Sequence, residues 1–227
     1  PIYGLTLIRS ACVAVAQISF YTALTKIEFA TATTLAYTSP FLVAALSVPL
    51  LGHKVGAWRW GAIVAGFGGV VMILKPFGDG FSLYMLLPVL AALGYALSSV
   101  LVRRYPPEAS SYGIQLTQQI CTMVLTTILL FTFSAPVAIT SATDAGLLIL
   151  MGIFGGIGVL CLVISYRMVD PSAVAPFEYF GLPIAFCMGW FFFQETPFDS
   201  LFPGVLFIVG AGLLIIIRER YHQRQQS

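Results

Sequence analysis

Short polar segments divide the sequence into eight apolar runs, each about 17 to 22 residues long. A helix needs about 20 apolar residues to cross the hydrocarbon core of a bilayer. A transmembrane β-strand would be about 10 residues long with strict alternation of apolar residues, and the runs show neither property. The sequence therefore predicts an all-α integral membrane protein with eight transmembrane helices. The runs are Leu5–Leu24, Ala30–Leu51, Trp58–Leu74, Phe81–Val102, Tyr112–Phe133, Gly146–Tyr166, Ser172–Phe193 and Leu201–Ile217.

The charged residues are too few to cover a soluble protein of this size. They make up 9% of the 227 residues, against roughly 25% in an average soluble domain. No clustered basic face predicts binding to nucleic acid. The four cysteines all fall inside apolar runs, without the spacing of a zinc or redox site. We expect no metal, no cofactor and no separate soluble domain, and the lipid bilayer as the main partner.

The distribution of Lys and Arg predicts the orientation of the helices. If the C-terminus is cytoplasmic, nine of the eleven basic residues lie on the cytoplasmic side, and Lys26 and Lys75 lie outside. A missed or invented helix would disturb this alternation, so the count of eight is consistent with it. Both ends of the chain are then cytoplasmic. The basic segment 219–227 is a cytoplasmic tail that anchors the topology.

An internal repeat relates the first three runs to the last three. An offset of 142 residues pairs Tyr37 with Tyr179, His53 with Glu195 and Gly68 with Gly210. Since the later unit has five runs, we expect residues 1–76 to be the last three helices of a first unit, and residues 81–218 to be a complete second unit. Two further helices would then precede this chain, and without them the bundle would show an open, lipid-facing groove. Units of five helices have opposite orientations, as in many secondary transporters.

Several motifs carry a resemblance to a known family. The segments ATATTLAYTSPFLVAAL, WGAIVAGFGGVVMILKP and SYRMVDPSAVAPFEY, with GWFFFQE, resemble the EamA-type domain of the drug/metabolite transporter superfamily. The resemblance implies a ten-helix bundle of two inverted five-helix units in the bacterial inner membrane. It also implies alternating access and a small metabolite or drug as substrate. Two positions depart from the family pattern, His53 in place of an acidic residue and Gln194 in place of glycine, and we interpret both as structural variation in loops.

Glu178 is the acidic residue that lies deepest within an apolar run. A charge there costs at least about 2.5 kcal/mol on insertion scales, so it should face the bundle interior or water. Pro176 and Pro183 flank it and can break the helix around a site. Glu178 is therefore a candidate to bind a substrate cation or to exchange a proton. The alternative is a hydrogen-bonded structural residue near the helix end.

Polar side chains at helical spacing give the other candidate substrate contacts. Amides that face lipid would be unpaired and costly, so the fifth run points its polar stripe into a cavity or a helix interface. In the second run, the alternative to substrate contact is hydrogen bonding of Thr and Ser to their own helix carbonyls. The stripe is Gln115, Gln118, Gln119, Thr122 and Thr126. The other candidates are Thr34, Tyr37 and Thr38 in the second run, Tyr179 in the seventh, Tyr95 and Ser98 in the fourth, and Gln17 and Tyr21 in the first.

Small residues and one arginine complete the pattern. Gly152 and Gly156 form a GxxxG motif, and Gly61, Ala65 and Gly69 form a small-residue stripe, both typical of close helix packing in lipid. Arg9 lies near a cytoplasmic helix end, from which its side chain can snorkel to the interface, with gating as the alternative.

A secondary transporter, with proton coupling through Glu178 as one option, is the function that these features favour. A non-transporting membrane sensor or scaffold remains an alternative. An enzyme is disfavoured because the sequence has no HExxH, GxSxG or Walker A motif. A channel is disfavoured because no ring of like charges or filter-like loop is present. The substrate, the direction of transport and the oligomeric state do not follow from the sequence.

Overall fold

The computed structural model describes residues 2–52, 57–74, 81–133, 139–169, 174, 181–194 and 202–211. These residues form helices joined by turns, and no strand occurs among them. In chain order the elements are α1 (Ile2–Leu24), α2 (Phe29–Ala36), α3 (Ser39–Leu51), α4 (Ala57–Leu74), η1 (Leu83–Met85), α5 (Leu86–Leu101), η2 (Val102–Arg104), α6 (Ser111–Phe133), α7 (Ala142–Met168) and α9 (Gly181–Phe193). Residues 204–211 form a further helical segment.

Five helical segments of the described chain are long and apolar enough to cross a membrane. They are Tyr3–Leu24, Phe29–Leu51, Leu83–Arg104, Ser111–Thr132 and Ala142–Met168. The apolar helices Trp60–Leu74 and Ile184–Phe193 are shorter. The all-helical fold class is confirmed, whereas the count of eight transmembrane helices remains a prediction.

The second apolar run forms two helices instead of the single one expected from the sequence. Tyr37 and Thr38 separate α2 from α3. Pro40, in the first turn of α3, has no backbone N–H to donate to the carbonyl of Ala36, four residues earlier. The proline therefore allows α3 to start anew after the turn.

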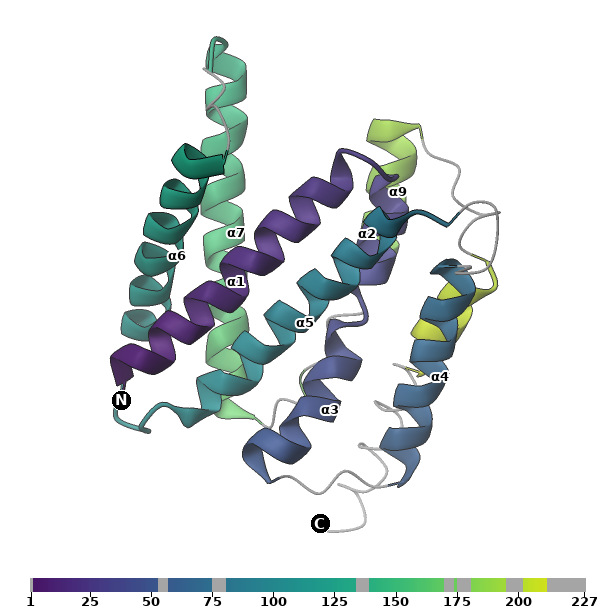
Figure 1. Cartoon of the computed structure of the whole chain (residues 1–227), viewed down its shortest axis with the longest axis horizontal. Helices are drawn as coiled ribbons and strands as arrows, with labels where there is room; N and C mark the ends of the chain where they lie inside the picture. Colours follow the sequence, from purple (N-terminus) through teal and green to yellow (C-terminus); the bar gives the residue numbers. More distant parts are fainter. Residues whose placement is uncertain are drawn as a thin grey trace.

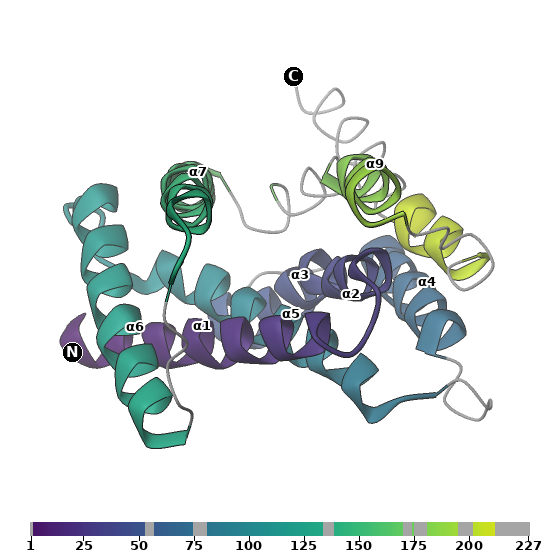
Figure 2. The same cartoon turned by 90° about the horizontal axis from the view of Figure 1, so that it is seen from above.

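The helices are arranged around the antiparallel pair α1 and α5 (Figure 1). A Cβ on Gly94 of α5 would lie 2.6 Å from the carbonyl oxygen of Cys12, so these two backbones touch without an intervening side chain. Seen from above, α7 and α9 lie on one side of the layer that contains α1, α5, α2 and α3 (Figure 2). Most side chains of α7 are apolar and exposed, which suits a helix whose solvent is lipid.

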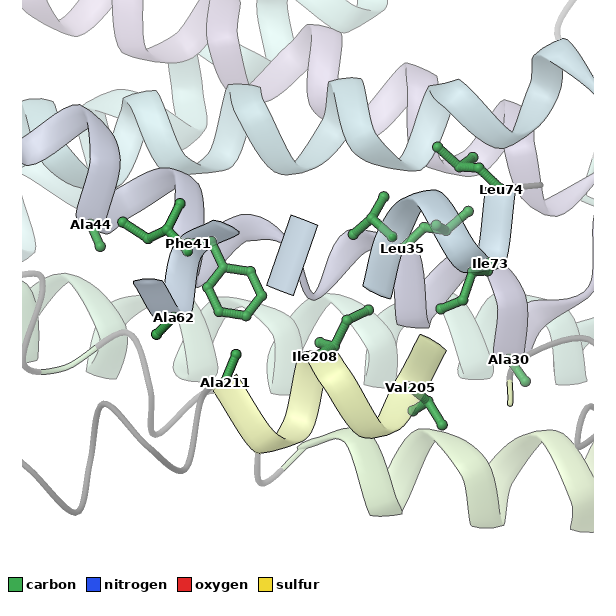
Figure 3. Packing of buried hydrophobic residues seen from close by; sticks show 12 residues of the cluster. Ala30, Leu35, Phe41, Ala44, Ala62, Ile73, Leu74, Val205, Ile208 and Ala211 are labelled. Carbon is green, nitrogen blue, oxygen red and sulfur yellow. The ribbon is translucent and has the colours of Figure 1, made fainter. Parts of the chain in front are cut away.

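Two apolar clusters hold the described helices together. In the first, Leu35 and Phe41 of the α2–α3 span pack with Ile73 of α4 and Ile208 of the 204–211 segment (Figure 3). In the second, Val43, Val100, Ile114 and Tyr166 join α3, α5, α6 and α7. The second cluster lies beside the polar side chains described next.

Candidate functional site

Buried polar side chains gather where α1, α5 and α6 meet. All are at most 6% exposed, although the surrounding helices are apolar. We call this group the Arg9 cluster: Thr6, Arg9 and Ser10 of α1, Ser98 of α5, Tyr105 directly after η2, and Gln115 and Gln118 of α6.

Hydrogen bonds connect three elements through Arg9 and Ser98. The Arg9 Nε donates to the Ser98 carbonyl oxygen at 2.9 Å, and the Gln118 Nε2 donates to the Ser98 Oγ at 3.5 Å. The Ser10 hydroxyl donates to the Gln118 carbonyl oxygen at 3.2 Å. These bonds hold α6 against both α1 and α5.

Tyr105 covers the guanidinium from the other direction. The Cζ atom of Arg9 lies 5.5 Å from the centre of the Tyr105 ring, within the range of a cation–π contact. The Tyr105 hydroxyl and the Thr6 hydroxyl form a hydrogen bond of 2.7 Å. The segment after η2 is thereby attached to the start of α1.

Part of the cluster's hydrogen-bonding capacity is unused. Within the described chain, the Arg9 Nη1, both amide atoms of Gln115 and the Gln118 Oε1 are buried without a hydrogen-bond partner, as is the Oγ1 of Thr122, about one turn further along α6. More than 90% of buried polar groups in proteins are normally paired. The cluster therefore has donors and acceptors available for a further polar group.

The snorkelling expected for Arg9 is wrong. Its side chain is 1% exposed and points into the helix junction. At ~1.5 Å per residue, Arg9 lies about 10 Å along α1 from its start, and the Ser98 carbonyl offers a nearby acceptor. The side chain therefore bonds within the bundle.

Two other arginines, one in η2 and one in the last turn of α7, bind backbone carbonyls, and the end of α5 before η2 and the end of α7 both lie at the lower side of the bundle in Figure 1. The Arg104 Nη2 donates to the Leu50 carbonyl oxygen at 2.9 Å. Arg167, at the end of α7, donates to the carbonyls of Pro106, at 3.0 Å, and Pro107, at 3.1 Å, and also to the Ala109 carbonyl. We call this the arginine-bearing end.

The predicted stripe on the fifth run is only partly buried. Gln115, Gln118 and Thr122 are buried, as the interface alternative expects. Gln119 is exposed, and the Thr126 hydroxyl donates to the Thr122 carbonyl oxygen at 2.8 Å within its own helix.

The candidates of the second run lie at the break between α2 and α3. The hydroxyls of Thr34 and Thr38 are buried and donate to the carbonyls of Ala30 and Leu35, at 2.7 and 2.8 Å. Tyr37 is half-buried, and a Cβ on Gly181 would overlap its hydroxyl. Tyr37 therefore touches the start of α9.

The remaining candidates lie apart from the Arg9 cluster or outside the described residues. Tyr95 and Gln17 are half-buried on α5 and α1, and Tyr21 is 52% exposed. Glu178 and Tyr179 lie outside the described residues, as do His53 and Glu195. Their roles remain predictions.

Comparison with known proteins identifies the family. The EamA-like transporter family model matches residues 3–75. A riboflavin transporter of Brucella anthropi is 30% identical over 220 residues, which cover 94% of this chain and 76% of that protein. The chain belongs to the EamA-like transporter family.

Other transporters and one solved structure are also similar to this EamA-like chain. A riboflavin transporter of Rhizobium johnstonii is 32% identical over 85% of this chain, and an S-adenosylmethionine uptake transporter of Rickettsia bellii is 29% identical over 84%. The chain spans 63% and 64% of those two proteins, somewhat under two thirds of their length. One crystal structure covers 99% of this chain, and the chain covers 79% of it, with a TM-score of 0.71 at 18% identity.

The EamA-like fold is therefore that of a multi-pass membrane protein whose relatives are named as transporters rather than enzymes. Sequence reasoning included Gln115, Gln118 and Ser98 among the candidates but did not place Arg9 and Tyr105 with them. An arginine inside an apolar run was the available signal, since such residues normally face the bundle interior.

Proposed function

We propose that this protein is a secondary transporter that moves a small metabolite or drug across the cytoplasmic membrane by alternating access. The observation that carries the proposal is family membership, with relatives named for riboflavin and S-adenosylmethionine transport. Buried polar side chains between otherwise apolar helices support it, because such residues in membrane helices commonly mark substrate pathways.

An inverted repeat of five plus five helices is part of this proposal. The offset of 142 residues carries the bounds of α3, Ser39–Leu51, onto those of α9, Gly181–Phe193. Gly52 and Gln194, which follow these two helices, share the offset and both have positive φ, at 71° and 54°. This agreement supports the division into a first unit within residues 1–76 and a second unit within residues 81–218.

Contacts between α4 and the 204–211 segment also agree with two-fold symmetry. A Cβ on Gly69 would lie 2.5 Å from the Gly204 carbonyl oxygen. The same offset converts the pair Gly69 and Gly204 into Ala211 and Ala62, and these two alanines lie near each other in the same buried cluster (Figure 3). Equivalent helices of the two units would then cross at their small residues.

We infer that the arginine-bearing end faces the cytoplasm. The elements that carry Arg9, Arg104 and Arg167 begin or end there, namely the start of α1, η2 after α5 and the end of α7, and basic residues concentrate on the cytoplasmic side of membrane proteins. This orientation also makes the C-terminus cytoplasmic, and the bacterial relatives favour an inner-membrane location.

Glu178 keeps its proposed role as the site for a substrate cation or a coupling proton. The proposal rests on the cost of placing a carboxylate within an apolar run, because such residues normally face the bundle interior or water. Alternating access requires such a site to be reached from each side in turn.

A ligand-stabilisation screen tests this function. Binding to the native state raises the apparent melting temperature in proportion to ln(1 + [L]/Kd). The panel contains riboflavin, S-adenosylmethionine, amino acids, nucleosides, carboxylates and cationic drugs, with Glu178→Gln measured beside the wild type. A hit that depends on Glu178 supports the site. A hit that Glu178→Gln retains, with unchanged pH dependence, would remove Glu178 from it.

A further inference from the structure

Arg9 is a buried cation that lacks a buried counter-charge among the described residues. The acidic side chains there are Glu28, Glu108 and Asp144, and all three are exposed. None of them bonds to the Arg9 Nη1, which is buried and has no hydrogen-bond partner among the described residues. Burying an uncompensated guanidinium is costly, so a site that retains one generally has a use for the charge.

The surroundings of Arg9 fix its guanidinium without using all of its donors. Nε is held by the Ser98 carbonyl at 2.9 Å, and the Tyr105 ring lies 5.5 Å from Cζ. Both contacts leave Nη1 free. A guanidinium that is anchored through Nε and has an unused donor at Nη1 is positioned to donate to an oxyanion, because hydrogen bonds from a guanidinium to a carboxylate or phosphate are charge-assisted and strong.

Two glutamine side chains of α6 add uncharged hydrogen-bond donors and acceptors at the same junction. Gln118 approaches Ser98 through its Nε2, and its Oε1 has no partner. Gln115, one helical turn earlier on the same face, is 5% exposed and uses neither of its amide atoms. The Gln115 amide can therefore donate to a ligand oxygen on the α6 side of the junction without breaking a hydrogen bond to a described residue.

We propose that the junction of α1, α5 and α6 is an oxyanion subsite, in which Arg9 binds a carboxylate or phosphate group of the transported molecule. This inference rests on the proposed transport function and specifies its substrate class. Arg9 is 1% exposed, so the oxyanion reaches it in a conformation in which the three helices separate at the arginine-bearing end. Alternating access provides a change of this kind.

Matched pairs of probes test the subsite in the purified protein. The first pair is riboflavin 5′-phosphate and riboflavin, and the second is S-adenosylmethionine and its methyl ester. Inorganic phosphate and chloride are measured alone. Affinities come from the shift of the melting temperature with ligand concentration. The proteins are the wild type, Arg9→Lys, Arg9→Gln and, as a matched control, Arg104→Gln, which removes an exposed arginine at the same end.

We expect the wild type to bind at least one probe that carries the free phosphate or carboxylate about tenfold more tightly than the partner that lacks this anionic group. Arg9→Gln should abolish this preference, Arg9→Lys should retain part of it because the charge remains, and Arg104→Gln should leave it unchanged. If Arg9→Gln does not fold, the preference in the wild type and its reduction in Arg9→Lys carry the test. Three results overturn the subsite: equal affinity for both members of each pair, no shift with either probe that carries a free phosphate or carboxylate, or an undiminished preference without Arg9.

A lipid phosphate could supply the same chemistry, so the measurements are repeated in phosphatidylcholine nanodiscs with and without phosphatidylglycerol. Stabilisation by phosphatidylglycerol that requires Arg9, without a response to soluble probes, assigns the site to lipid and overturns the substrate proposal. Transport of a neutral compound independently of Arg9 would overturn the subsite while the transport function stands. Failure of the transport function itself would appear as absence of flux for every compound.

Discussion

At the residue scale, Tyr105 has two separate functions in the Arg9 cluster. Its ring lies against the guanidinium, and its hydroxyl bonds to Thr6 of α1. The ring and the hydroxyl can be separated by a single substitution, because phenylalanine keeps the aromatic face and loses the oxygen.

Tyr105→Phe should lower the free energy of unfolding by about 1 kcal/mol, the usual net value of one buried hydrogen bond. The melting temperature in detergent measures the loss, and the oxyanion preference should persist because Arg9 keeps its aromatic contact. The double variant Thr6→Val with Tyr105→Phe should lose less than the sum of the single variants. Additive losses would show that the two hydroxyls are not coupled.

Residue type alone could predict which polar side chains avoid lipid, but not which of them meet. The spacing of Gln115 and Gln118 correctly placed both on a buried face. Ser98 lies twenty residues before Gln118 and Arg9 lies on another helix, so their contact depends on how α1, α5 and α6 pack. That packing depends on close approaches such as Gly94 against Cys12, which no periodicity within one helix indicates.

At the element scale, the ends of α3 and α9 share one conformation but differ in sequence. Gly52 adopts a φ of 71° without strain, whereas Gln194 adopts a φ of 54° despite its Cβ. A left-handed conformation costs a non-glycine residue roughly 1–2 kcal/mol. Glutamine in place of the family's glycine at position 194 therefore lowers the stability of the end of α9.

Gln194→Gly should raise the free energy of unfolding by about 1 kcal/mol, and Gly52→Ala should lower it by a similar amount. The melting temperatures of the two variants should move in opposite directions. The exposed bond from Gln194 Nε2 to the Phe191 carbonyl, at 3.3 Å, is lost in the first variant and offsets little of the gain. A destabilised Gln194→Gly would mean that this side chain holds the helix end.

The contact between α4 and the 204–211 segment gives a second prediction at this scale. Gly69→Ala should destabilise the protein by about 1–3 kcal/mol, because its Cβ would lie 2.5 Å from the Gly204 carbonyl oxygen. Gly68→Ala is the matched control, since a Cβ there would meet no heavy atom of the described residues within 4 Å. Its stability should be unchanged or slightly higher, because alanine favours the helix. Equal melting temperatures for the two variants would contradict a close backbone contact at Gly69.

The small-residue motifs predicted only some of the close contacts between helices. Gly69 of the predicted stripe does lie at a close contact, whereas a Cβ on Gly152 or Gly156 would meet nothing within 4 Å among the described residues. A GxxxG motif shows that two helices can approach closely, but it does not name the partner. The partner depends on tertiary arrangement, so the sequence could predict the helices better than their contacts.

At the scale of the whole molecule, Arg167 attaches α7 to the segment between α5 and α6. Its guanidinium donates to the Ser111 Oγ at 3.0 Å and to three backbone carbonyls of residues 106–109. Val163 and Tyr166 near the same end of α7 are buried in the second apolar cluster, so Arg167 adds polar contacts to the apolar packing that holds this end of α7.

Arg167→Met should therefore lower the melting temperature by the equivalent of about 2 kcal/mol or more, because several charge-assisted bonds are lost together. Arg104→Met, which removes one bond at an exposed side chain, should cost clearly less. Comparable losses would mean that α7 is held mainly by other contacts.

The positions of the helices could be predicted from the sequence more fully than the contacts between them. Run lengths predicted helices, and the described helices coincide with the runs, apart from the break that Pro40 permits at Tyr37 and Thr38. Proline positions signalled a break at Glu178 as well, but that residue lies outside the described residues.

Solute flux in proteoliposomes is the measurement that tests the transport function most directly. Each compound that stabilises the protein is loaded unlabelled inside the vesicles, and entry of the labelled compound is followed with and without protein. We predict saturable, protein-dependent entry that excess unlabelled compound outside inhibits. A compound that binds and stabilises the protein but never crosses the membrane would contradict transport and would favour a sensor or scaffold.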